Sequence, residues 1–159
     1  MQVGVLSDTH IHVWPQDLLA EVNNLFRNVE LVLHAGDIVH VSILEALHKP
    51  VVAVAGNSDG AMVQASQPLS RIIRLAGYRI GLIHGYGPAE GLAERVFDFF
   101  AAQNVDAIVF GHSHIPMAEY NNGIFMFNPG SLTSSRSEFN SLGILQLNGH
   151  IDGKIIRLD

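Results

Sequence analysis

The sequence predicts an α/β protein in which two β-sheets pack face to face and helices cover their outer faces. Up to residue 55, short apolar runs alternate with helical stretches, an order typical of parallel strands joined by crossover helices. The C-terminal third instead pairs apolar runs around turn residues, which indicates antiparallel hairpins. A chain of 159 residues that is 48% hydrophobic suits a single domain with one contiguous core, spanning residues 1–159.

The first half is expected to contain three short buried strands and two helices. The strands are predicted at residues 2–6, 31–33 and 51–55. Residues 16–27 favour an amphipathic helix, whose inner face would carry Leu18, Leu19, Val22, Leu25 and Phe26. Residues 41–47 favour a second helix, which Lys49-Pro50 would end. Residues 58–69 show no clear period and are expected to form a loop.

The second half is expected to contain three hairpins, one helix and one further buried strand. Residues 71–75 and 79–83 flank Gly77-Tyr78 and read as the first hairpin. Residues 88–103 favour a helix, with Leu92, Val96, Phe99 and Phe100 facing inward. A buried strand is predicted at residues 107–110. The two remaining hairpins are predicted at 117–120 with 124–127, and at 142–147 with 154–158, around turns that accept a positive φ.

Composition and charge argue against several classes of protein. The net charge of −6 disfavours a broad surface for duplex nucleic acid. Because the chain has no cysteine, disulfides and thiolate metal sites are excluded. The start MQVGVLSDTH has no basic segment followed by a cleavable apolar stretch, and no apolar run approaches the length of a membrane span. We therefore expect a cytoplasmic protein without membrane partners.

Side chains that can bind metals follow five of the predicted strands, at the point where each strand ends. In sheets of this kind, ligands bind beyond the carboxyl ends of the strands. The spacing of Asp8-x-His10 and of His112-x-His114 fits extended chain, in which alternate residues point to one side. We therefore expect these side chains to converge. The five stretches are Asp8-Thr9-His10, Gly36-Asp37, Gly56-Asn57-Ser58-Asp59, His84-Gly85 and Gly111-His112-Ser113-His114.

The types of donor in these stretches indicate the kind of metal site. Imidazole nitrogen with carboxylate and amide oxygen, and no sulfur, suits Mn²⁺, Fe²⁺ or Zn²⁺ better than copper(I) or an iron–sulfur cluster. Seven donors are too many for one catalytic ion that keeps an open position, but they fit two ions that share a bridge. The excess positive charge of two such ions would attract a phosphate ester and acidify a bound water. The predicted ligands are Asp8, His10, Asp37, Asn57, His84, His112 and His114.

In this order and spacing, the five stretches resemble the motifs of the calcineurin-like metallophosphoesterase superfamily. The pattern of that superfamily is Asp-x-His, Gly-Asp, Gly-Asn-His-Asp/Glu, His and Gly-His-x-His, and the resemblance runs from residue 5 to about residue 131. The small size of the chain and the stretch Asn128-Pro129-Gly130-Ser131 look most like the compact YfcE-type phosphodiesterase branch. The resemblance implies a four-layer α/β/β/α sandwich made of two mixed β-sheets flanked by helices.

The resemblance also implies a dinuclear metal centre and a mechanism. By position, Asp8, His10, Asp37 and His114 would hold the first ion, and Asp37 would bridge to a second ion completed by Asn57, His84 and His112. Mn²⁺ is the expected metal, with Ni²⁺, Fe²⁺, Zn²⁺ and Mg²⁺ as alternatives. A metal-bound hydroxide would attack phosphorus. The residues implied in catalysis are Asp37, Asn57 and His84.

One position departs from the pattern of the superfamily. Many relatives have a histidine directly after the motif asparagine, which helps to protonate the leaving group or to grip the phosphate, whereas this chain has Ser58. A serine cannot act as a general acid near neutral pH. We therefore expect modest rates that depend on the pKa of the leaving group.

Other polar residues near the motifs are expected to have supporting or surface positions. His34 is expected to pack or to support a ligand, and Asn128 and Ser131 to shape a loop near the metals. His12 and His40 read as loop or helix-start residues. Arg136 could reach a substrate phosphate, although a solvated loop position is the plainer interpretation.

The sequence leaves several functions open. A metal-dependent phosphodiesterase acting on small phosphodiesters is the main hypothesis. The alternatives are a non-catalytic protein–protein scaffold of the same fold, since the superfamily includes a retromer subunit of that kind, and a broad small-molecule phosphatase. A nuclease is disfavoured by the acidic charge balance. A homo-oligomer is possible, because small members of this family often associate.

Overall fold

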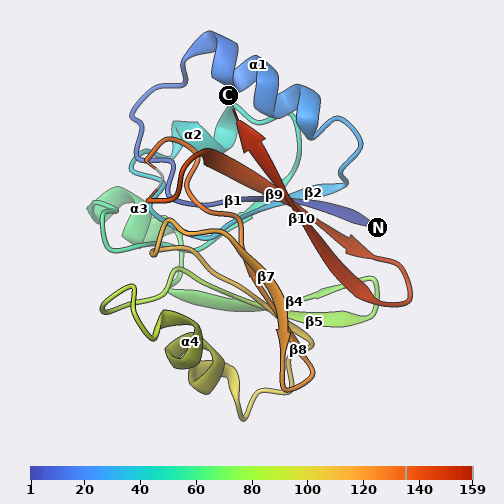
Figure 1. Cartoon of the computed structure of the whole chain (residues 1–159). Coiled ribbons are helices and arrows are strands. Elements are labelled where there is room, and N and C mark those ends of the chain that lie inside the picture. The colour runs from blue at the N-terminus through green and yellow to red at the C-terminus, as the bar shows by residue number, and fades with distance from the viewer. Residues whose placement is uncertain (135, 159) are drawn as a thin grey trace.

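The computed structural model describes residues 1–134 and 136–158, and two five-stranded mixed sheets form its centre (Figure 1). The first sheet has the spatial order β10-β9-β1-β2-β3, and the second has the order β4-β5-β6-β8-β7. The first sheet contains β1 (Gln2–Leu6), β2 (Leu31–His34), β3 (Val51–Ala53), β9 (Asn140–Leu147) and β10 (Ile151–Leu158). The second contains β4 (Ser70–Leu75), β5 (Tyr78–Ile83), β6 (Ala107–Val109), β7 (Met117–Asn121) and β8 (Ile124–Asn128).

Three separate apolar cores divide the molecule into four layers. Val3, Leu33, Leu82 and Phe127 belong to the core that both sheets share. Helix α1 (Gln16–Leu25) lies on the outer side of the first sheet, with α2 (Ser42–Glu45) beside it (Figure 1), and Val22, Phe26 and Ile43 fill the core there. Helix α4 (Leu92–Phe100) covers the second sheet through Leu92, Val96 and Phe100. The α/β/β/α order is thus confirmed.

Strand direction explains why the carboxyl ends of several strands gather at one edge. Strand β1 pairs in parallel with β2, and β2 with β3, so these three strands end at the same edge of the first sheet. In the second sheet β5, β6 and β8 are parallel to one another. The three predicted hairpins are present as the antiparallel pairs β4–β5, β7–β8 and β9–β10.

The structure corrects the predicted loop at residues 58–69. Helix α3 (Ala61–Ser66) lies within it, and its single buried apolar side chain is Val63. Local hydrogen bonds organise this short helix, since the Gln64 amide donates to the Asp59 carbonyl at 2.7 Å. Six residues with one buried position give too little periodicity for recognition from sequence.

The structure also corrects the predicted helix at residues 88–103. Helix α4 begins only at Leu92, because Gly91 has φ +68° and the preceding segment forms a glycine-rich loop. Phe99 was expected to face inward, but it is 41% exposed and packs edge-to-face on Phe100. The helices predicted at 16–27 and 41–47 are also shorter in the structure. No helix in residues 1–134 or 136–158 is long and apolar enough to cross a membrane.

Candidate metal centre

The seven predicted ligands converge on one site, because the two sheets bring their strand ends together. Asp8 and His10 follow β1, Asp37 follows β2, and Asn57 follows β3, all in the first sheet. His84 directly follows β5, and His112 and His114 follow β6, in the second sheet. The site therefore straddles the two sheets, with four of the seven predicted ligands from the first sheet and three from the second.

The first group of donors is Asp8, His10 and His114. Their ligand atoms all lie within 4.8 Å of one another. The His114 Nε2 lies 3.1 Å from Asp8 Oδ1 and 3.2 Å from His10 Nε2. These distances between neighbouring donors suit a cation placed among them, because ligands bound to one ion lie about 3 Å apart when each metal–ligand distance is about 2.1 Å.

The second group of donors gathers around His84. Its Nε2 lies 3.4 Å from Asp37 Oδ1 and 3.1 Å from Asn57 Oδ1. The same Asn57 oxygen lies 2.8 Å from His112 Nδ1. Asp37 faces both groups, because its other oxygen, Oδ2, lies 3.5 Å from His10 Nε2.

Asp8 provides the test of whether these residues fit a cation. Its side chain is fully buried, and Oδ2 accepts hydrogen bonds from the Ser7 hydroxyl at 2.6 Å and from the His112 backbone amide at 3.0 Å. In the part of the chain that the structure describes, Oδ1 is the only buried side-chain nitrogen or oxygen without a hydrogen-bond partner. A buried carboxylate oxygen left unpaired is costly. A cation at this position would satisfy it, so the residues fit a metal ion.

Backbone carbonyls fix which nitrogen of each imidazole faces the site. The Nδ1 of His84 lies 2.7 Å from the Ala35 carbonyl, and the Nδ1 of His114 contacts the Ser134 carbonyl. His112 is held the other way round, with its Nε2 at 2.7 Å from the Gly87 carbonyl. A carbonyl can only accept, so each of these nitrogens donates, and in a neutral ring the opposite nitrogen keeps a lone pair for a metal.

The electrostatics of the site favour positive charge. Burial alone would raise the pKa of Asp8, but the nearby imidazoles of His10, His114 and His84 hold it well below its ordinary value. Burial would likewise raise the pKa of Asp37, and its hydrogen bond with His84 outweighs this and lowers the pKa. The pKa of His114 is raised by the adjacent carboxylate of Asp8. Carboxylates that stay charged beside imidazoles that hold protons form a site where cations are bound in exchange for protons.

The backbone at the site corrects the expectation of extended chain. Five of the seven ligands have a positive φ, between +46° and +67°, namely Asp8, His10, Asp37, His112 and His114. The paired ligands therefore converge through left-handed turns and not through strand alternation. Such conformations in residues other than glycine cost about 1 kcal/mol or more each, and they persist where the surrounding structure imposes them.

Two glycines next to the ligands leave no room for a side chain. A Cβ at Gly111 would collide with the Ser7 hydroxyl and with the Asp8 carboxylate. A Cβ at Gly56 would collide with Asp37. Both glycines are therefore required by close packing against a candidate ligand.

Several residues around the ligands have supporting positions. The carboxylate of Asp59 ties two ligand loops together, because it accepts from the backbone amides of Val39 at 2.6 Å and of Gly56 at 2.7 Å. The Ser131 hydroxyl donates to the Asp8 carbonyl at 2.8 Å, and the Asn128 amide donates to the Gly111 carbonyl at 2.9 Å. His34 is fully buried and lies 3.3 Å from the Thr9 hydroxyl. Ser131 and Asn128 thus hold backbone next to the candidate ligands, and His34 packs in the interior.

The supporting carbonyls of Ala35, Gly87 and Ser134 were not anticipated, because every residue has a carbonyl and the sequence carries no signal for those that matter. His12 and His40 are exposed, and His40 hydrogen-bonds Ser42 at 2.8 Å instead of reaching the ligands.

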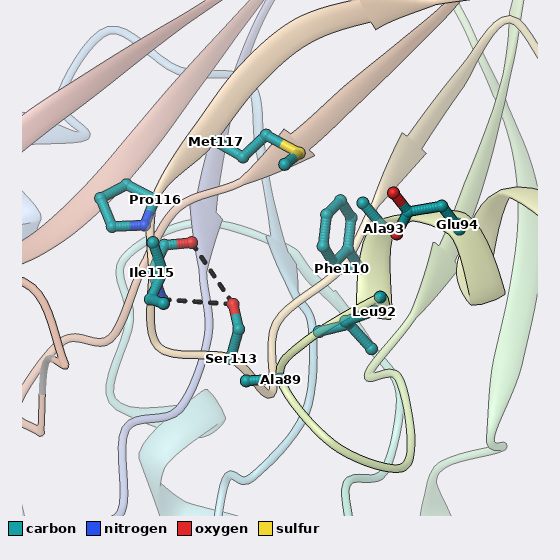
Figure 2. Close-up of a pocket in the computed structure, with 10 residues that line it drawn as sticks. Ala89, Leu92, Ala93, Glu94, Phe110, Ser113, Ile115, Pro116 and Met117 are labelled. Atoms are coloured by element: carbon teal, nitrogen blue, oxygen red, sulfur yellow. Dashed lines mark hydrogen bonds between the residues drawn. The ribbon is translucent and has the colours of Figure 1, made fainter.

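Two recesses lie near the strand ends, and they differ in chemistry. The first has a volume of about 190 Å³ and opens over the ligands, and its walls also include Ser58, Ser134 and Arg136. The second has a volume of about 210 Å³ and lies between α4 and residues 110–117, where Leu92, Phe110 and Met117 make it largely apolar (Figure 2). Only the first brings imidazole, carboxylate and amide donors together, whereas Glu94 is the one carboxylate that lines the second.

The chain matches the model of the calcineurin-like phosphoesterase superfamily domain over residues 1–150. It is 35% identical over 160 residues to a probable metallophosphoesterase of Methanothermobacter thermautotrophicus, covering 99% of this chain and 92% of the relative. It is also 37% identical over 97 residues to the phosphodiesterase YfcE of Escherichia coli, covering 56% of this chain and 47% of the relative. A structure of Vps29 from Entamoeba histolytica with Zn²⁺ superposes with a TM-score of 0.75, at 24% identity and full coverage of both chains, which shows a shared fold.

Together, the fold, the polar residues at the strand ends and these similarities identify the chain as a metallophosphoesterase. The chain belongs to the calcineurin-like phosphoesterase superfamily, and its relatives include a phosphodiesterase of the YfcE type, as the motifs indicated.

Proposed function

We propose that the chain is a phosphodiesterase that hydrolyses small phosphodiesters with two divalent metal ions, of which Mn²⁺ is the favoured choice. The observation that supports this best is the position of Asp37 between two groups of donors, with Oδ2 facing His10 and Oδ1 facing His84. A carboxylate in that position can bridge two ions. The donor set of imidazole, carboxylate and amide suits Mn²⁺ and related divalent metals.

The residues would divide the work as follows. Asp8, His10 and His114 would hold one ion, and Asn57, His84 and His112 the other, with Asp37 common to both. When bound, such a pair of ions supplies a nucleophile derived from water at neutral pH and stabilises charge on the phosphoryl group. Ala35 and Gly87 would orient His84 and His112 through their carbonyls.

The recess over the ligands favours a small substrate. Its volume of about 190 Å³ leaves space for a phosphoryl group beside the candidate ligands. Arg136 is exposed on its wall and is the cationic side chain there among the described residues, so it is the candidate to bind a non-bridging phosphate oxygen.

The residue at position 58 predicts which diesters react. The Ser58 hydroxyl donates to Asp37 Oδ2 at 2.8 Å, and its backbone amide donates to Asp37 Oδ1 at 2.8 Å. Ser58 therefore orients the shared carboxylate and supplies no acid. Diesters with acidic leaving groups, such as nitrophenolate, should react readily, whereas those with alkoxide leaving groups should react slowly.

The test is to strip the protein of metal and measure rates on bis(p-nitrophenyl) phosphate and on p-nitrophenyl phosphate. Mn²⁺, Mg²⁺, Ni²⁺ or Zn²⁺ is then added back one at a time. Metal-dependent cleavage of the diester, abolished in Asp37→Asn and retained in the surface control Asp17→Asn, is the expected result. Faster cleavage of the monoester would instead favour the broad small-molecule phosphatase.

A non-catalytic scaffold is the second candidate, because the fold is shared with Vps29 over the full length of the chain. The two proposals differ in a measurable way. Two ions bound per chain with no turnover of any diester, under any of the four metals, would favour the scaffold.

A further inference from the structure

The segment between β5 and α4 carries the carbonyl that holds His112. Residues 85–91 contain Gly85, Gly87 and Gly91, all with positive φ between +68° and +106°. The Gly87 carbonyl lies 2.7 Å from His112 Nε2, on the side of the ring away from Asn57. Figure 2 shows this segment leading into α4 beside the loop that carries Ser113 and Ile115. A loop so rich in glycine has little intrinsic preference for one conformation, so some other group must hold it.

Arg95, one turn into α4, is that group. Its guanidinium donates to three backbone carbonyls of the segment: Nε to Tyr86 at 3.0 Å, Nη1 to Glu90 at 2.9 Å, and Nη2 to Pro88. The three acceptors enclose Gly87 in the sequence. One rigid, planar side chain therefore fixes the loop on both sides of the carbonyl that contacts His112.

The glycines of the segment make room for this arginine. A Cβ at Gly87 would lie 3.2 Å from Arg95 Nε, and a Cβ at Gly91 would lie 3.2 Å from Arg95 Nη1. Both distances are shorter than ordinary van der Waals contact. A side chain at either glycine would therefore crowd the guanidinium of Arg95.

We propose that Arg95 is a positioning residue for the second metal ion and acts through Gly87 and His112. With the Gly87 carbonyl in place, His112 Nε2 donates to it, so Nδ1 keeps its lone pair and faces the Asn57 oxygen at 2.8 Å. Without Arg95, the carbonyl is no longer held, and His112 can rotate or exchange the proton between its two nitrogens. The inference rests on the proposed function in one respect, namely that Asn57, His84 and His112 hold an ion.

The test is a calorimetric titration of metal-stripped protein with Mn²⁺ alone, on wild type, Arg95→Lys and Arg95→Ala. Lysine keeps the charge but cannot bridge three carbonyls. One of the two Mn²⁺ sites should weaken by about tenfold or more in both variants, as is usual when the partner of a ligand is removed, and the other site should be unchanged. Adding guanidinium ion to Arg95→Ala should restore part of the lost affinity.

Arg79 offers a matched control. It is also a half-buried arginine, and it donates to the carbonyls of Asn104 at 2.8 Å and Gln103 at 2.9 Å, on a loop that makes none of the contacts of the metal centre. Arg79→Lys should leave both Mn²⁺ affinities at the wild-type value. Equal weakening in Arg79→Lys and Arg95→Lys would show a general loss of structure and overturn the proposal, as would unchanged affinities in both Arg95 variants.

The outcome can be separated from that of the proposed function. If wild type binds two ions but hydrolyses no diester, the proposed function fails and the Mn²⁺ titration still decides the role of Arg95. If wild type binds a single ion, both proposals are overturned.

Discussion

The two halves of the metal centre are built differently. On the side of Asp8 two of the three donors, Asp8 and His114, are buried, and Asp8 lies between Ser7 and the backbone of His112. On the side of Asn57 only His84 is buried, whereas Asn57 is exposed and His112 is half-buried. The first half is therefore part of the folded core, whereas the second depends on how a glycine-rich loop and an exposed turn are held. The two halves should respond differently to substitution.

The largest effect is expected for Asp8→Asn. The variant removes the one buried oxygen that lacks a partner and halves the carboxylate charge of the site. Loss of a ligand should exceed the roughly 100-fold loss seen when only the partner of a ligand is removed. Diesterase activity should therefore fall by more than about 100-fold, and elemental analysis should find one ion per chain or none. Two bound ions and wild-type rates in Asp8→Asn would contradict the assignment of the buried half.

His112→Ala should affect only the exposed half. We expect one ion to remain at wild-type affinity and the other to be lost, with activity reduced by about 100-fold because a single ion cannot act on both sides of the phosphoryl group. The measurement compares the metal content and the diesterase rate of His112→Ala with those of His114→Ala. If the two variants lose metal in the same way, the distinction between the halves is wrong.

The buried half should also make the metal-free protein sensitive to acid through His34. Desolvation lowers the pKa of this fully buried imidazole to about 3, from an ordinary value of 6.5. Because the unfolded chain takes up the proton first, stability is lost as pH falls from about 6.5 toward 3, by up to ~1.4 kcal/mol per pH unit.

Urea unfolding of the metal-free protein between pH 7.5 and pH 4.5 measures this effect. His34→Asn should reduce the slope of the unfolding free energy against pH by the equivalent of about one proton taken up on unfolding. His48→Asn, at an exposed histidine, should leave the slope unchanged. Identical slopes for wild type and His34→Asn would rule out the buried, neutral imidazole.

The smallest effects should come from two serines, one in each half. Ser131→Ala removes a buried hydroxyl that donates to the Asp8 carbonyl and accepts from the Ser134 amide, so about 1–3 kcal/mol of stability should be lost. Ser58→Ala, at an exposed position, should cost less than about 0.5 kcal/mol. Thermal denaturation of the two metal-free variants shows which one loses more stability. A larger loss in Ser58→Ala than in Ser131→Ala would contradict the prediction.

The convergence of the seven candidate ligands could be predicted from sequence, because each follows an apolar strand. The chain order of strands and hairpins was likewise readable from apolar runs and turn residues. Helix α3 was missed, because it has one buried side chain and depends on contacts of Asp59 and Gln64. The left-handed backbone at Asp8 and His112 was also missed, since only the tertiary structure imposes it.

The supports of the ligands are the least predictable part of the site. His84, His112 and His114 are each oriented by a main-chain carbonyl, and no residue type marks such a group. Arg95 lies eleven residues beyond His84 on a helix whose sequence reads as an ordinary amphipathic surface. Its contacts depend on the conformation of the loop before α4, which no residue pattern specifies.

The position of β1 between β2 and β9 has a consequence for the synthesis of the protein. Gln2 pairs with Gln146, so β1 gains its second neighbour only after residues 140–147 have also been made. At 5–20 residues per second that delay is on the order of ten seconds. During this time one edge of an apolar strand stays open to pairing with other chains. Premature termination before residue 140 should therefore yield a product that aggregates.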